Sequence, residues 1–263
     1  MNSLRTPFGA TIALLSVTAL LYLIIPIAVV LIAPLGETGY LSFPPKGLTL
    51  KWYQAALADS RYVDSFLNSL WIAGWVTVIA TLTGVPAAYA LSRHAFPGAR
   101  ALEALFLSPL ILPTLVLALG LALWFNRMGF VAGTPRLIAA HLVLCVPYVI
   151  RVCLPVFRRF DRSLEEAAAN LGARPLHAFV LVMLPVVRPG IAAAATMAFI
   201  TSFDELVLAL FLADPARPTL PVTIYSAVQL GFEPTVAAVS GLLVLLGTAL
   251  LLILQWLNRN ASQ

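Results

Sequence analysis

Four long stretches of this chain contain no charged residue, and each is long enough to cross a membrane as a helix, which takes about 20 mostly apolar residues. They are residues 6–36, 65–92, 104–126 and 234–258. Two further apolar stretches contain charges: 137–157 includes Arg151, and 189–213 includes Asp204 and Glu205. The sequence therefore predicts an all-α membrane protein with six transmembrane helices, at about 11–33, 66–91, 104–125, 137–157, 189–212 and 235–257.

Composition supports this fold class. Of the 263 residues, 61% are hydrophobic and 10% are charged, whereas a soluble domain has about 25% charged residues. This excludes an ordinary soluble enzyme and a disordered chain. The basic residues stand between apolar stretches instead of forming a stripe on one soluble face, so we expect membrane lipid and no nucleic acid as a partner.

We expect one transmembrane domain over residues 1–263. Arg5 precedes the first apolar stretch, as a basic residue does in a signal peptide, but the stretch exceeds 20 residues, against 7–15 for the apolar region of a signal peptide. We therefore expect it to be retained as a span.

The distribution of Arg and Lys predicts the orientation in the membrane. With the N-terminus inside, nine basic residues fall in inner segments and six in outer ones. The loop 158–188 alone contains five arginines. Because positive residues favour the cytoplasmic side, both termini are predicted to be cytoplasmic.

No catalytic or metal site is predicted. Cys145 and Cys153 are eight residues apart, roughly 12 Å along a helix, which is too far for a disulfide. The three histidines are scattered, and the sequence contains no H-E-x-x-H or G-x-S-x-G pattern. We therefore expect a protein that is not an enzyme.

The outer segment 34–65 is predicted to contain a short amphipathic helix that begins at Lys51-Trp52-Tyr53. Trp and Tyr favour the level of the lipid headgroups, so this helix could anchor the chain at the interface. Contact with an external protein is the alternative.

The cytoplasmic loop 158–188 is predicted to contain an amphipathic helix. Ser163 and Glu166 fit a capping box at its start, and Gly172 fits a left-handed residue at its end. A second short helix, about 176–183, is expected to end near Leu184-Pro185. The apolar face could pack on the spans or dock into a cytoplasmic partner. It comprises Leu164, Ala167, Ala168 and Leu171.

This loop resembles the EAA loop of ATP-binding-cassette (ABC) importer permeases of type I, whose pattern is E-A-A-x3-G-x9-I-x-L-P. Val182 replaces the isoleucine. The matching residues are Glu166, Ala167, Ala168, Gly172, Leu184 and Pro185. Segments 68–70, 87–93 and 107–113 are similar to the same family.

The second half is similar to the polyamine branch of this family, and within it to the C type of spermidine/putrescine permease. The similar strings are Ser202-Phe203-Asp204-Glu205, Leu220-Pro221 and Gly231-Phe232-Glu233-Pro234. Permeases for other amines, iron and phosphonates share much of this pattern.

The resemblance implies a transport machine of the bacterial inner membrane. A second permease subunit, usually forming a heterodimer, would enclose the pathway with this chain. A dimer of a cytoplasmic ATPase would bind ATP and Mg, and a periplasmic solute-binding protein would deliver the cargo. This chain would bind no cofactor, and it contains no G-x4-G-K-[ST] motif. The six residues matching the EAA loop would couple it to the ATPase.

Charges within an apolar span are costly, roughly 2.5–3.5 kcal/mol each on insertion scales, so they normally face a partner or a wet cavity. We expect Asp204, with Ser202 and Glu205, to line a solute pathway and attract a cation. Two alternatives remain open: an ion pair, with Arg151 as one candidate, and a gradient-driven secondary transporter that uses Asp204 and Glu205.

Two groups of residues are expected to shape the spans. Ser108, Pro109 and Pro113 should disturb the third span, because proline lacks a backbone donor, either for gating or for packing. Gly190 and the alanines 192–195 should allow close helix packing.

Overall fold

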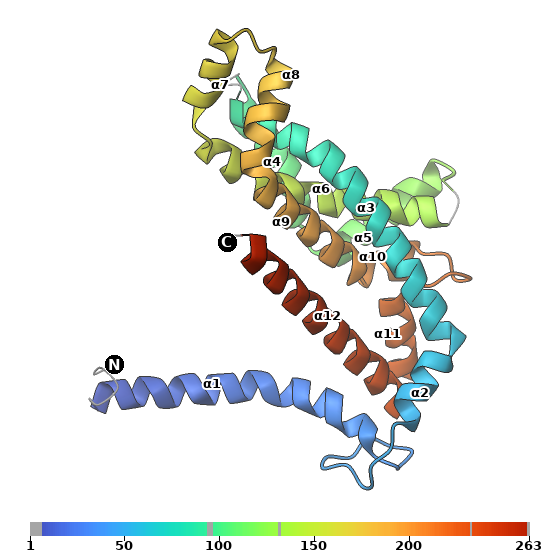
Figure 1. Cartoon of the computed structure of the whole chain (residues 1–263). Coiled ribbons are helices and arrows are strands. Elements are labelled where there is room, and N and C mark those ends of the chain that lie inside the picture. The colour runs from blue at the N-terminus through green and yellow to red at the C-terminus, as the bar shows by residue number, and fades with distance from the viewer. Residues whose placement is uncertain (1–6, 94–96, 131–132, 232, 262–263) are drawn as a thin grey trace. The chain divides into compact units, whose positions relative to one another are not determined.

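The computed structural model describes residues 7–93, 97–130, 133–231 and 233–261, and every regular element among them is a helix. The chain divides into two compact units, Met1–Val63 with Thr223–Gln263, and Asp64–Val222. Two helices, α3 (Ser60–Arg93) and α11 (Leu220–Leu230), run from one unit into the other. Figure 1 shows the order of the elements along the chain.

Within the described residues, four helical segments are long and apolar enough to cross a membrane, and a fifth is added if one bent pair forms a single span. The first is α1 (Pro7–Ile32), which continues through the short helix η2 (Ala33–Leu35). The sixth predicted span corresponds to α12 (Pro234–Ala261). The fold is thus that of an all-helical membrane protein, while the count of six spans stays a prediction.

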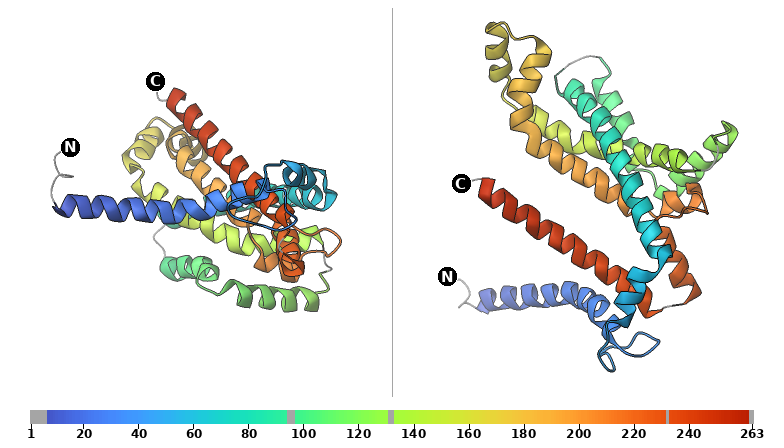
Figure 2. Two further views of the ribbon diagram at one scale, coloured as in Figure 1. Left: turned by 90° about the horizontal axis from the view of Figure 1, so that it is seen from below. Right: turned by 45° about the vertical axis from the view of Figure 1, so that its right-hand side comes forward.

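In the first unit, α1, η2 and α12 converge at the short helix α2 (Lys51–Ala58), as Figure 2 shows. The predicted helix beginning at Lys51 is confirmed. Its aromatic side chains fasten it to the preceding segment: Trp52 Nε1 donates to the Gly36 carbonyl at 3.0 Å, and the Tyr53 hydroxyl donates to the Leu31 carbonyl at 2.7 Å. These two bonds give Trp52 and Tyr53 a structural role within the unit, whereas anchoring at the membrane interface stays a prediction.

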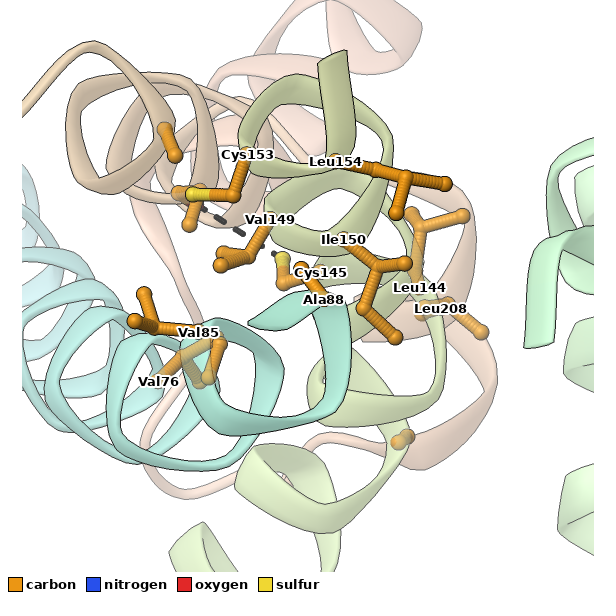
Figure 3. Close-up of a cluster of buried hydrophobic side chains, with 14 of the residues drawn as sticks. Val76, Val85, Ala88, Leu144, Cys145, Val149, Ile150, Cys153, Leu154 and Leu208 are labelled. Atoms are coloured by element: carbon orange, nitrogen blue, oxygen red, sulfur yellow. Dashed lines mark hydrogen bonds between the residues drawn. The ribbon is translucent and has the colours of Figure 1, made fainter. Parts of the chain in front are cut away.

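The second unit is built around α6 (Thr134–Arg159). Packed on it are α4 (Ala99–Leu107), η3 (Ser108–Leu110), α5 (Thr114–Arg127), α9 (Leu184–Phe203) and α10 (Val207–Leu212). Figure 3 shows its apolar core, where Val76, Val85 and Ala88 of α3 face Cys145 and Val149 of α6. Both cysteines are free and buried.

Small residues bring helices close to α6. A Cβ atom added at Gly84 would lie 2.8 Å from Cγ1 of Val149, and one at Gly190 would lie 2.8 Å from Cγ2 of Val156. The predicted packing role of Gly190 is confirmed, as is that of Ala194, which is fully buried. Ala192 and Ala193, in contrast, are exposed.

The third predicted span is not one straight helix, and the disturbance expected from Pro109 and Pro113 is confirmed. It forms α4, η3 and α5, bent by 98° at the break. Proline explains the break, because the residue before a proline is disfavoured in the helical region and proline has no N–H to donate. Pro109 lies in the first turn of η3, and Pro113, with φ −56° and ψ 127°, precedes α5.

The fifth predicted span is also interrupted. Helix α9 ends at Phe203, and α10 begins at Val207. The Glu205 carboxylate explains the new start, since its Oε1 accepts hydrogen bonds from the N–H groups of Val207 at 2.9 Å and Leu208 at 3.1 Å. The expectation of one continuous helix through both carboxylates is therefore wrong.

The short helix expected at 176–183 does not end at Leu184-Pro185. Helix α8 (Pro175–Ala178) continues through the π-helical turn η4 (Phe179–Met183) into α9, so the helix is unbroken from Pro175 to Phe203 (Figure 1). The Leu184 N–H donates to the Phe179 carbonyl, five residues back. A wider turn of this kind accommodates Pro185, whose missing N–H and ring would disturb a regular α-helical turn.

The contact of Gly84 with Val149 can be tested by Gly84→Ala. The added methyl group overpacks the contact with α6, so we expect a loss of about 1–3 kcal/mol of stability and a lower thermal unfolding temperature of the purified chain in detergent. Gly74→Ala is the matched control on the same helix, since nothing lies within 4 Å of a Cβ atom there. Equal unfolding temperatures for the two variants would contradict this packing.

Candidate functional site

The helix α7 (Arg162–Asn170) lies in the loop 158–188, and Asp161 precedes it as the N-cap. Oδ1 of Asp161 accepts a hydrogen bond from the Ser163 backbone N–H at 2.9 Å, and this bond lowers the pKa of the Asp161 carboxyl below its ordinary value. The predicted capping box of Ser163 and Glu166 is wrong, because Ser163 lies inside the first turn. Asp161 has the same ability to accept this bond and stands earlier in the chain.

The end of α7 agrees with the prediction. Gly172 has φ +86°, the left-handed conformation that glycine adopts without a steric penalty. The Gly172 N–H donates to the Ala169 carbonyl at 2.9 Å, and the Ala173 N–H donates to the Ala168 carbonyl at 3.0 Å. These two bonds form a Schellman motif. Backbone groups at both ends of α7 therefore form hydrogen bonds with residues directly next to the helix.

The apolar face of α7 is only partly covered. Ala168 is half-buried, and α7 packs against η4 and α8. Leu164 is 45% exposed and Leu171 is 90% exposed, while Glu166 and Ala167 are also exposed. Packing against the spans therefore accounts for one edge of the helix and leaves the other edge open to a partner.

The remaining residues of the EAA-like string lie at the start of α9. Leu184 is half-buried and Pro185 is exposed. Both belong to the unbroken helix from Pro175 to Phe203, which is 29 residues long, or about 43 Å at 1.5 Å per residue. This helix connects the neighbourhood of α7 to the break at Asp204.

At that break the structure separates the three residues expected to act together. Asp204 is exposed at the C-terminus of α9, whereas Glu205 is half-buried and caps α10. Ser202 is 4% exposed, inside the unit. The three ion pairs among the described side chains do not include Asp204 with Arg151.

Ser202 has a partner that sequence analysis missed. Its Oγ lies 2.8 Å from Nδ1 of His141, which is 1% exposed. This hydrogen bond joins α6 to the last turn of α9, directly before the break. The sequence did contain one indication of this bond: His141 stands in an apolar span, and a buried polar group there needs a hydrogen-bonding partner.

Comparison with known proteins gives one family match. Residues 80–263 match the family described as "Binding-protein-dependent transport system inner membrane component".

Two relatives from Escherichia coli (strain K12) are similar over most of the chain. The putrescine transport system permease protein PotI is 32% identical over 254 residues, covering 93% of this chain and 89% of the relative. The spermidine/putrescine transport system permease protein PotC is 28% identical over 242 residues, covering 92% and 91%. Both similarities extend well beyond the loop 158–188.

Among solved structures, the fold is similar to a chain of a bacterial ABC transporter involved in the import of the acidic polysaccharide alginate. The TM-score is 0.77 at 19% identity, and 97% of each chain is covered. The similarity therefore includes both units of the chain.

The bond between Ser202 and His141 can be tested by Ser202→Ala. This change leaves a buried imidazole nitrogen without its partner, which costs about 1–3 kcal/mol, so we expect a lower unfolding temperature of the chain in detergent. Adding His141→Leu should recover much of the loss, because both polar partners are then absent. Unfolding of Ser202→Ala at the wild-type temperature would show that the bond contributes nothing.

Proposed function

The chain belongs to the inner membrane components of binding-protein-dependent transport systems, and we propose that its cargo is a polyamine or a related small cationic solute. It is a permease subunit of an ATP-driven ABC importer, a transport subunit of the inner membrane and not an enzyme. The similarities support this function and give no support to the gradient-driven alternative.

The proposed cargo rests on Asp204 together with the two relatives named for putrescine and spermidine. Asp204 is exposed where α9 ends. The C-terminus of a helix carries a partial negative charge, so the carboxylate and the helix end add their negative potentials at one point. A cationic solute is attracted there, and an anionic one is repelled.

Within the proposed pathway, Ser202, Asp204 and Glu205 have different tasks. Asp204 meets the solute. Glu205 holds the break open by capping α10, and Ser202 holds the last turn of α9 against α6 through His141. At this one break, the Asp204 carboxylate is exposed, while the Glu205 carboxylate is bound to the backbone of α10.

We further propose that α7 docks on the ATPase. The exposed edge of Leu164, Ala167 and Leu171 would enter a groove of the ATPase, and Glu166 would pair with a basic group there. Gly172 sets the sharp turn after the helix, and Ala168 packs toward η4. Displacement of α7 would then pass through η4, Leu184 and Pro185 into α9 and reach the break at Asp204.

The complete machine would contain a dimer of this ATPase, which binds ATP and Mg, a second permease subunit forming a heterodimer with this chain, and a periplasmic solute-binding protein. This chain would bind no cofactor itself. Six spans with both termini in the cytoplasm would place α7 on the side of the ATPase. The family description supports the dependence on a binding protein.

Glu166→Arg tests the docking of α7. Reversing the charge should lower binding of the ATPase by about tenfold, which corresponds to roughly 1.4 kcal/mol, and uptake should fall with it. The measurement is the amount of ATPase that co-purifies with the permease complex, together with uptake in proteoliposomes.

Glu37→Arg is the control for a charge reversal away from α7. Unchanged co-purification and unchanged solute-stimulated ATP hydrolysis in Glu166→Arg would contradict the docking role.

Asp204→Asn tests the cargo site. Loss of the charge should lower uptake of labelled putrescine or spermidine about tenfold at low solute concentration, the effect of roughly 1.4 kcal/mol, while Asp204→Glu should retain most of it. Wild-type uptake should require ATP and tolerate a protonophore.

Uptake by Asp204→Asn at the wild-type rate and affinity would show that Asp204 does not meet the solute. Absence of polyamine uptake by the wild-type complex would exclude this cargo and leave the ABC permease assignment in place.

A further inference from the structure

The first turn of α7 is joined to the cytoplasmic end of α3 by a buried ion pair. Nε of Arg93 lies 3.1 Å from Oε2 of Glu165, and the side chains are 7% and 19% exposed. In the other two ion pairs among the described side chains, the arginine is 73% or 51% exposed. Arg93 and Glu165 thus form the best-shielded ion pair in the described part of the chain.

The surroundings of the pair make each partner depend on the other. The Arg93 guanidinium lies 5.6 Å from the ring centroid of Phe160, a buried residue directly after α6. Nε and Nη2 of Arg93 and Oε1 of Glu165 are buried and form no hydrogen bond among the described residues, so the contact between the two side chains is an ion pair. Removing one member would therefore leave the other charge without its partner.

A second contact joins the same two helix ends. Nη2 of Arg162, the first residue of α7, donates to the Ser92 carbonyl of α3 at 3.1 Å. Two consecutive residues at the end of α3 therefore hold the start of α7. The adjacent carboxylates Glu165 and Glu166 point in directions about 100° apart on the helix, so one binds inside the chain and the other is exposed.

Two residues nearer the N-terminus of α3, Asn68 and Ser69, hold a different segment. The Asn68 side-chain amide donates to the carbonyls of Arg217 and Pro218, at 2.8 and 3.1 Å. Oγ of Ser69 accepts from the Leu220 N–H at 2.8 Å. Between Ser69 and Arg93 the helix rises about 36 Å, so α3 is a strut between α7 and the segment that follows α10.

We propose that Arg93 is a positioning residue that transmits the displacement of α7 to α3. Through the pair with Glu165, movement of α7 reaches the segment 217–220 as well as the break at Asp204, so both sides of α10 receive it. This inference rests on the proposed docking of α7 on the ATPase.

A charge swap tests the inference. The variants are Arg93→Glu, Glu165→Arg and the double change, in the complete complex reconstituted in proteoliposomes. We expect each single change to lower the solute imported per ATP hydrolysed about tenfold, within the range of typical coupling energies, while the ATPase still co-purifies. The double change restores the pair and should recover the ratio to within about twofold.

The pair of Arg158 and Glu103 is the matched control. It also joins two helices of this unit, at 2.7 Å, but its arginine is 51% exposed. Because exposed pairs contribute about 0–1 kcal/mol, Arg158→Glu should leave the ratio near the wild-type value. If Arg158→Glu lowers the solute imported per ATP hydrolysed by the same factor, the effect comes from charge reversal in general and the role of Arg93 is overturned.

A second measurement uses the chain without the ATPase and separates the inference from the proposed function. A spin label is attached at Leu171→Cys, an exposed position of the loop, in nanodiscs; both native cysteines are buried. Arg93→Glu and Glu165→Arg should each increase the mobility of the label, and the double change should restore it.

Unchanged mobility, or an import ratio at the wild-type value in both single variants, overturns the role of Arg93. A double change that behaves no better than the singles overturns it as well. Failure of the ATPase to co-purify with the wild-type permease refutes the docking of α7 instead, and the mobility measurement still decides whether the pair holds α7.

Discussion

A membrane interior offers no water to backbone N–H and carbonyl groups, so an apolar helix can stop there only where its free groups find other partners. This chain stops two such helices. At one break proline removes the donor, and at the other the Glu205 carboxylate accepts the two N–H groups that open α10. The start of α10 depends on this cap, and Asp204 lies exposed directly before it.

The two acidic neighbours show how a charge within an apolar stretch can serve structure and function together. A glutamate can fold back to its own backbone two and three residues ahead, as Oε1 of Glu205 does. Asp204 stands one residue earlier, at the end of α9, with its carboxylate exposed. The same division recurs on α7, where Glu165 is engaged inside the chain and Glu166 faces outward.

The features that sequence analysis predicted are those encoded by length or by fixed local spacing. Apolar length located the helices, and the string from Glu166 to Pro185 indicated the family and the left-handed Gly172. The prolines of the third span indicated its disturbance before the structure showed the bend. The break at Glu205 was missed, because hydropathy sums over a stretch and does not record which side chain takes over a backbone donor. Pairs such as His141 with Ser202 or Arg93 with Glu165 join positions 61 and 72 residues apart, and no local pattern announces them.

The π-helical turn η4 affects how far α9 is rotated about its axis relative to the loop that contains α7. Each residue of an α-helix turns the chain by about 100°, and η4 accommodates one residue more than a regular turn would before α9 continues. Deleting one residue between Gly172 and Pro185 would turn α9 about its axis relative to α7 and aim Asp204 in another direction. Surface loops usually tolerate insertions and deletions. In this loop, by contrast, the number of residues determines the direction in which the distant Asp204 carboxylate points.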